Sequence, residues 1–78
     1  MDPIEISLHM DAQGPARPLT FTWRGSVYRV SAVGRRWQAD DGEHILVMVA
    51  PANRVFELLH PPSGLWQVVK SPPTRVRA

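Results

Sequence analysis

Two short segments that alternate apolar and polar residues flank the dipeptide Arg24-Gly25, and this pattern constrains the fold more than any other part of the chain. Residues 19–23 and 26–30 have the period of two that is typical of strands with one buried face. Glycine readily adopts the positive φ that a two-residue hairpin connection needs. The pattern therefore predicts a tight antiparallel hairpin in which Phe21 pairs with Tyr28.

The register of this hairpin also predicts which of its side chains form the core. Phe21, Trp23, Tyr28 and Val30 fall on one face of the two strands. Large aromatic and β-branched side chains that share a face are expected to point inward, where their burial stabilises the sheet. The opposite face, expected to meet solvent, carries Thr20, Thr22, Arg24, Val27 and Arg29.

Strands are also expected on both sides of the hairpin. Residues 4–10 alternate with period two and predict a first strand, followed by a loop over the turn-forming residues 11–18. The second hairpin strand is expected to continue through a bend at Gly34 to Trp37 and to end before the acidic turn at residues 40–42.

The second half of the chain predicts three more strands. The continuous apolar run 45–49 is typical of a central strand covered on both sides, or of a strand inside a small barrel. Residues 53–60 fit either a strand or a short helix capped by Asn53. A strand is favoured, because the segment is short and the turn residues 61–64 lead into the apolar segment 65–70, which reads as its return strand.

Together these segments predict an all-β fold, either a small antiparallel barrel or a compact two-layer sheet of five to six short strands. A chain of 78 residues has room for one domain, expected over residues 1–70, and residues 71–78 are expected to form a disordered basic tail. The chain has no cysteine, so its core must be stable without disulfides or thiolate metal sites. A monomer or a weak homodimer is expected.

The residues that could perform chemistry do not form a known pattern. The spacing of His9, His44 and His60 matches no set of metal ligands, so these are expected to be ordinary surface or boundary side chains. Asp40 and Asp41 lie in a glycine-containing turn, where carboxylates are usually solvated. No serine occupies a strand-to-helix elbow, and the five glycines are too scattered for a phosphate loop. We therefore expect no enzymatic activity, no cofactor and no bound metal.

Positive charge is concentrated in one region of the chain. Residues 12–39 include five arginines and no aspartate or glutamate, within a chain of net charge +2. This region is interpreted either as a solvated outer face or as an anion-binding face. Proteins that bind single-stranded nucleic acid combine cationic contacts to phosphate with rings on which bases stack, and a half-exposed Trp37 would provide such a ring. The expected binding residues are Arg24, Arg29, Arg35, Arg36 and Trp37.

The hairpin also resembles a known family. Residues 18–25 read Pro-Leu-Thr-Phe-Thr-Trp-Arg-Gly and are followed by Tyr28-Arg29-Val30, which resembles a family of small bacterial proteins of unknown function with a Trp-Arg-Gly hairpin signature. Residues 56–58 and 64–68 are similar to the closing hairpin of that family, so the resemblance covers about residues 18–70. The family is associated with error-prone Y-family DNA polymerases and mutagenesis accessory proteins. The resemblance thus implies a role near DNA repair or damage tolerance, without catalytic residues.

Two functions follow as expectations. The first is a non-enzymatic β module that binds nucleic acid, with single-stranded DNA favoured. The alternative is a protein–protein interaction or structural accessory domain, which would act through a sheet edge or self-association and could contact a polymerase-like partner. The chain has no apolar run long enough to span a membrane, and its acidic start does not resemble a signal peptide. A cytoplasmic location is therefore expected, with no membrane partner.

Overall fold

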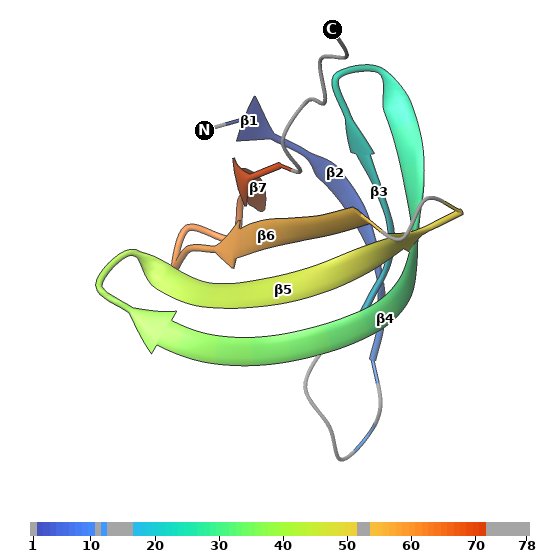
Figure 1. Ribbon diagram of the computed structural model, residues 1–78. Helices are drawn as coiled ribbons and strands as arrows, with labels where there is room; N and C mark the ends of the chain where they lie inside the picture. The colour runs from blue at the N-terminus through green and yellow to red at the C-terminus, as the bar shows by residue number, and fades with distance from the viewer. Residues whose placement is uncertain (1, 11, 13–16, 52–53, 72–78) are drawn as a thin grey trace, which may run out of the picture.

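The computed structural model describes residues 2–10, 12, 17–51 and 54–71. These residues form one strongly curled antiparallel sheet with the strand order β1-β7-β6-β5-β4-β3-β2 (Figure 1). The described part of the chain contains no helix, so the predicted all-β fold is confirmed. The strands are β1 (Asp2–Pro3), β2 (Glu5–His9), β3 (Arg17–Trp23), β4 (Ser26–Ala39), β5 (Gly42–Ala50), β6 (Arg54–His60) and β7 (Gln67–Lys70).

The predicted hairpin forms in the predicted register. Phe21 pairs with Tyr28 and Trp23 pairs with Ser26 across β3 and β4. The two turn residues both have positive φ, 51° at Arg24 and 79° at Gly25, as a type I′ hairpin requires. The turn twists in the same sense as the flanking strands, and it fixes which side chains reach the core.

Strand β4 is much longer than its partners and bends along its length (Figure 1). It has 14 residues, and its register with β5 shifts between Val30 and Ala32 and again between Val33 and Arg36. Each shift inserts an extra residue into β4, and such bulges bend a strand and increase its twist. The bend predicted at Gly34 is therefore confirmed, and these bulges are what curl the sheet.

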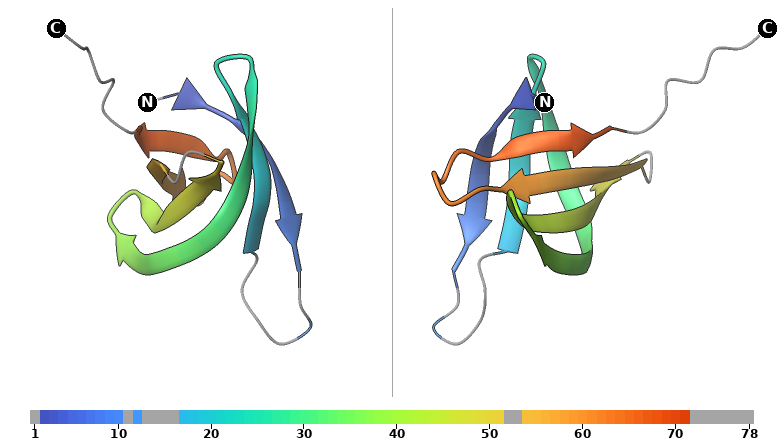
Figure 2. Two further views of the ribbon diagram at one scale, coloured as in Figure 1. Left: turned by 45° about the vertical axis from the view of Figure 1, so that its right-hand side comes forward. Right: turned by 90° about the vertical axis from the view of Figure 1, so that its left-hand side faces the viewer.

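The N-terminal segment connects the two ends of the curled sheet (Figure 2). Its first part, β1, pairs with β7, and its second part, β2, pairs with β3. Between them, the Ile4 amide donates a hydrogen bond of 3.0 Å to the Trp66 carbonyl. One segment thus provides both terminal strands of the sheet, β1 beside β7 and β2 beside β3, and brings the two ends of the half-barrel together.

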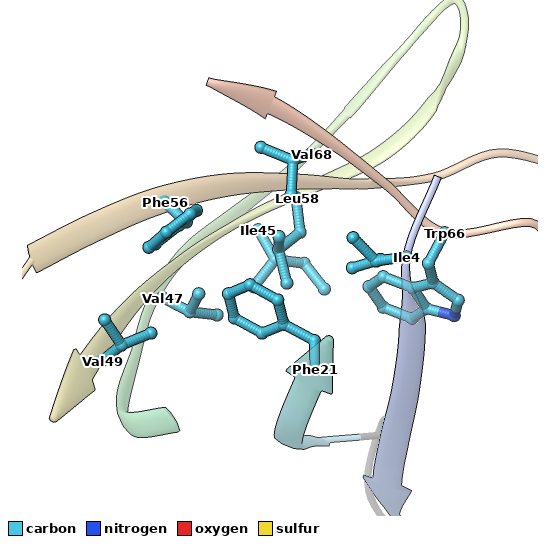
Figure 3. Packing of buried hydrophobic residues seen from close by; sticks show 9 residues of the cluster. All are labelled: Ile4, Phe21, Ile45, Val47, Val49, Phe56, Leu58, Trp66 and Val68. Atoms are coloured by element: carbon cyan, nitrogen blue, oxygen red, sulfur yellow. The ribbon is translucent and has the colours of Figure 1, made fainter. Parts of the chain in front are cut away.

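The core lies on the concave side of this half-barrel (Figure 3). Phe56 of β6 is fully buried, and its ring centroid lies 5.1 Å from that of Phe21, 5.3 Å from that of Trp23 and 5.1 Å from that of Tyr28. The predicted inward face of the hairpin is therefore confirmed, with Phe21 buried and the other two rings partly buried. The other buried members of the cluster are Ile4, Ile45, Val47, Val49, Leu58, Trp66 and Val68.

The start of β3 differs from the sequence prediction. Residues 17 and 18 were expected in a loop, but they belong to β3 and pair with β2, with Leu8 opposite Pro18 and His9 opposite Arg17. Proline is tolerated here because the β3–β4 ladder does not extend to residue 18, so no β4 carbonyl needs its missing amide proton. Pro18 is fully buried, an outcome that turn propensity alone does not predict.

Two expectations concern the second half of the chain. Residues 54–60 form a strand, as favoured over the helix. Of the two alternatives for the apolar run in β5, the structure has the strand of a small half-barrel and not the strand covered on both sides: its core-facing residues are buried, but Leu46 and Met48 are only half-buried. The expected tail falls on residues 71–78, of which only Ser71 lies within the described residues.

The central position of Phe56 generates a first prediction. Phe56→Ala should lower the free energy of unfolding by about 3–5 kcal/mol, because it removes a ring that three others contact and leaves a cavity. In so small a domain this loss is enough to unfold most of the protein. Val55→Ala, at an adjacent position that is 46% exposed, should cost less than about 1 kcal/mol. Equal midpoints for the two variants in urea denaturation would contradict this assignment of the core.

Candidate functional site

The residues predicted to bind a partner all lie on β4 or in the turn before it. Arg29 and Arg35 are exposed, and Arg29 belongs to the face of β4 turned away from the core, which we call the outer face. The guanidinium carbon of Arg35 lies 5.4 Å from the centre of the Trp37 ring. That of Arg24, in the turn, lies 4.6 Å from the centre of the Trp23 ring. Both contacts are of the cation–π type.

Arg36 is separated from the other predicted arginines. It pairs in register with Ile45, a core residue, so its side chain leaves β4 on the inner side. Its Nη1 atom lies 3.6 Å from Oε2 of Glu43, and both side chains are largely covered. Arg36 is thus engaged in an ion pair, and the structure does not bring it together with Arg29 and Arg35.

Trp37 is half-buried, as the sequence predicted, and its position is set by a histidine. It lies directly opposite His44 in the β4–β5 register. The two rings are stacked with centroids 5.3 Å apart and an angle of 17° between their planes. Because His44 packs against the indole in this way, less of the ring is open to a partner than a fully exposed tryptophan would offer.

His44 is the centre of a hydrogen-bonded cluster that the sequence did not reveal. Its side chain is 10% exposed, with Nδ1 2.7 Å from Oε2 of Glu57 and Nε2 2.7 Å from Oδ1 of Asp41. An ionised carboxylate can only accept hydrogen bonds, so both ring nitrogens must donate. The geometry therefore indicates a doubly protonated imidazolium between two carboxylates.

The electrostatics agree with this protonation state. The hydrogen bond to Asp41 raises the pKa of His44 above its ordinary value of 6.5, and the bond to Glu57 adds to the effect, while desolvation opposes it. The pKa of Asp41 is lowered from 3.8, mainly by the same hydrogen bond with His44. Each charge therefore favours the ionised form of its partner.

Local geometry and strand register together assemble this cluster. Asp41 precedes Gly42, whose φ of 135° favours glycine and whose Cβ, if present, would lie 2.5 Å from the carbonyl oxygen of His60. The turn can therefore pack closely against the end of β6. Glu57 reaches His44 because β5 and β6 pair with Leu46 opposite Glu57, which places His44 and Glu57 on the same face.

One sequence expectation is corrected here and another is extended. His44 was expected to be an ordinary surface or boundary histidine, but it is buried. Asp41 is exposed, as expected for a turn carboxylate, but it also forms a hydrogen bond with His44. The spacing Asp-x-x-His across a tight turn was a signal for this pair. The contribution of Glu57 had no such signal, because it depends on the register of a strand paired through a separate loop.

The described residues show neither a metal site nor a large small-molecule pocket. Within the described residues, no group of three or more histidine, cysteine, aspartate or glutamate side chains is placed to hold a metal ion. In the His44 cluster the two ring nitrogens point away from each other, so the carboxylates lie on different sides of the ring. Three hollows bordered by described residues measure about 230, 280 and 230 Å³, below the range of about 300–1,000 Å³ usual for small-molecule sites.

Comparison with known proteins gives one match. The family described as Domain of unknown function (DUF6504) matches residues 1–45, more than half of the 78 residues. This agrees with the predicted membership of a family of unknown function, but the match ends at residue 45, whereas the resemblance extended to about residue 70. No curated protein and no solved structure matches the chain. The described residues also contain no helix long and apolar enough to cross a membrane.

The His44 cluster generates a prediction about pH. A pKa that is raised in the folded state means that the cluster stabilises the protein fully below 6.5 and loses this contribution as the pH rises through the folded-state value. The lowered pKa of Asp41 means that its contribution is present above 3.8 and lost in acid. The free energy of unfolding should therefore decrease from neutral toward alkaline pH.

Replacement of the histidine tests this prediction. His44→Gln should lower the free energy of unfolding near neutral pH by about 1–3 kcal/mol, because Glu57 then loses a charged donor in a covered position. It should also remove most of the decrease at alkaline pH in urea denaturation. His9→Gln, at an exposed histidine outside the cluster, is the control and should retain the wild-type dependence. The same pH dependence in His44→Gln would show that other groups cause it.

Proposed function

The chain belongs to the DUF6504 family, whose function is unknown, and we propose that it is a non-enzymatic module that binds nucleic acid on the outer face of β4. The main interactions in this proposal are between phosphates and the side chains of Arg29 and Arg35. Arg24 extends the cationic surface at the hairpin turn, and Trp37 provides an aromatic edge beside Arg35.

The observation that carries the proposal is that two arginines of β4 form no ion pair within the described residues, while carboxylates near β4 are paired. Among the residues that the structure describes, neither Arg29 nor Arg35 forms an ion pair, and both side chains are exposed. Three carboxylates near β4 are already bound: Glu43 by Arg36, and Asp41 and Glu57 by His44. The charges of Arg29 and Arg35 are therefore not paired with a carboxylate of the described residues, which favours a polyanionic partner.

DNA is the nucleic acid that we favour. The resemblance of the hairpin to proteins associated with Y-family polymerases supports a role in DNA repair or damage tolerance. Single-stranded DNA is favoured over duplex, because the unpaired bases of a single strand can stack on an aromatic ring such as Trp37 while their phosphates meet arginines. His44 leaves only part of that ring open, so the arginine–phosphate interactions are expected to supply most of the affinity.

The proposal is tested by fluorescence anisotropy with single- and double-stranded oligonucleotides at several salt concentrations. Affinity should fall linearly with salt on a double-logarithmic plot. Arg29→Ala/Arg35→Ala should weaken binding and reduce the slope for the single strand by about 0.7 for each phosphate that the variant no longer neutralises. The double variant should remain folded, because both side chains are exposed.

A second double variant with the same change in net charge serves as the control. Arg54→Ala/Lys70→Ala removes two exposed cations from β6 and β7 and should leave affinity and slope within experimental error of the wild type. Equal weakening in both double variants would indicate an effect of net charge alone. No binding by the wild type at low salt would exclude the proposed function.

A second candidate function, a protein-interaction domain, is favoured by one apolar hollow. It measures about 230 Å³ and is bordered by Gly34, Leu46 and Met48 together with Val55, which is 46% exposed. Apolar surface of this kind, next to exposed arginines, can associate with a second copy of the chain or another protein.

Self-association is measured by light scattering over a range of protein concentrations. If the apolar hollow mediates it, the average mass should rise with concentration, and Val55→Glu should restore the monomer mass by placing a charge in the interface. Val27→Glu, at a position that is 72% exposed, is the matched control and should behave as the wild type. A constant monomer mass for the wild type would exclude self-association through this face.

A further inference from the structure

Strands β3 and β4 separate midway along their length. Their ladder runs from Trp23 opposite Ser26 to Thr20 opposite Arg29, and no further residues pair between them. Beyond this point β3 pairs only with β2, and β4 pairs only with β5. Figure 2 shows β4 bending away from β3. We call this opening the β3–β4 split.

Irregularities in both strands coincide with the split. Leu19 has no partner in the β2–β3 pairing, and Ser31 has none in the β4–β5 pairing, so each is the extra residue of a bulge. Bulges of this kind bend strands and end pairing. The Ser31 hydroxyl donates a 3.1 Å hydrogen bond to the Met48 carbonyl, which holds the β4 bulge in place. On the other side, Pro18 has no amide proton with which to extend the ladder. The local sequence of each strand therefore opens the split.

The split contains a hollow of about 230 Å³, bordered by residues 17–19 of β3 and 30–33 of β4. This is smaller than a usual small-molecule site but is of a size to receive one side chain. Leu19, at its border, is 43% exposed. The hollow thus lies beside a length of β4 that β3 no longer covers, where an added strand could find main-chain hydrogen bonds.

Arg17 gives the hollow its charge. Its side chain is exposed at the border of the hollow, and Arg17 takes part in no ion pair within the described part of the chain. A carboxylate placed here would form a charge-assisted hydrogen bond. A nucleic acid strand fits less well, because one arginine and an apolar border offer little to its repeated phosphates.

We propose that the β3–β4 split is a docking site for an extended segment of a partner protein. The segment adds a strand against residues 30–33 of β4, places one apolar side chain in the hollow and sets a carboxylate against Arg17. The border of the hollow does not include Arg29 or Arg35, although residues 30–33 lie between these two arginines in β4.

The experiment uses the full chain to select binders from a phage-displayed library of random linear peptides. The enriched peptides should alternate apolar and polar residues and carry aspartate or glutamate. In NMR titrations with the synthetic form of an enriched peptide, the amide signals of residues 17–19 and 30–33 should shift most. Arg17→Glu should weaken binding about tenfold or more, as expected when a hydrogen bond to a charged group is removed.

Matched variants separate this site from general effects of charge and hydrophobicity. Lys70→Glu makes the same charge change as Arg17→Glu at an exposed residue of β7. Leu65→Glu is the control for Leu19→Glu, because Leu65 is also exposed, at 56%, and lies outside the hollow. Leu19→Glu should abolish binding, whereas both controls should change it less than twofold.

Three results would overturn the proposal. The first is that the selection enriches no peptides. The second is that the enriched peptides bind Arg17→Glu and Leu19→Glu as well as they bind the wild type. The third is that the peptide shifts only the amide signals of the outer face around Arg29 and Arg35. An oligonucleotide that shifts the same signals at residues 17–19 and 30–33 would assign the split to nucleic acid instead. Arg29→Ala/Arg35→Ala does not change the residues that border the split. A loss of oligonucleotide binding with unchanged peptide binding in this variant would therefore concern the proposed function alone, and the docking proposal is tested separately by peptide binding.

Discussion

The packing of Phe56 against the rings of the hairpin is the interaction on which the rest of the structure depends. Phe56 lies on β6, and two strands separate β6 from β3 in the sheet, yet its ring lies 5.1 Å from that of Phe21. This distance is attainable only if the sheet curls on itself. The bulges of β4 provide the bend, and burial of the rings makes it favourable. The N-terminal segment can then pair with both β7 and β3.

The curl also determines what the surface can do. The concave side is occupied by apolar side chains, so a binding site of useful size can form only on the outer face, at the rim or where strands separate. On the outer face, the His44 cluster binds the carboxylates of Asp41 and Glu57 and supports Trp37, while Arg29 and Arg35 are left exposed. The bulge that bends β4 at Ser31 also opens the split from β3. Fold and proposed binding surfaces therefore have a common physical origin.

The predicted binding residues show which side-chain positions the alternation of strand residues can predict and which it cannot. Alternation placed Arg29 on the solvent side correctly, because a regular hairpin with a two-residue turn allows one register. The same reasoning treated Arg35 and Arg36 as one cationic group. The bulge between Val33 and Arg36 and the ion pair with Glu43 separate them. A local pattern cannot predict an ion pair whose partner lies on another strand.

The sequence by itself determined the β class, the hairpin at Arg24-Gly25 with its inward rings, the strand at residues 54–60 and the bend near Gly34. These features depend on turn chemistry and side-chain period, which act over a few residues. Only the tertiary structure decided that β3 begins at Arg17, that one face of β5 stays partly open, and that His44 lies between Asp41 and Glu57. Those outcomes depend on which strands become neighbours, and that is settled by the curl of the whole sheet.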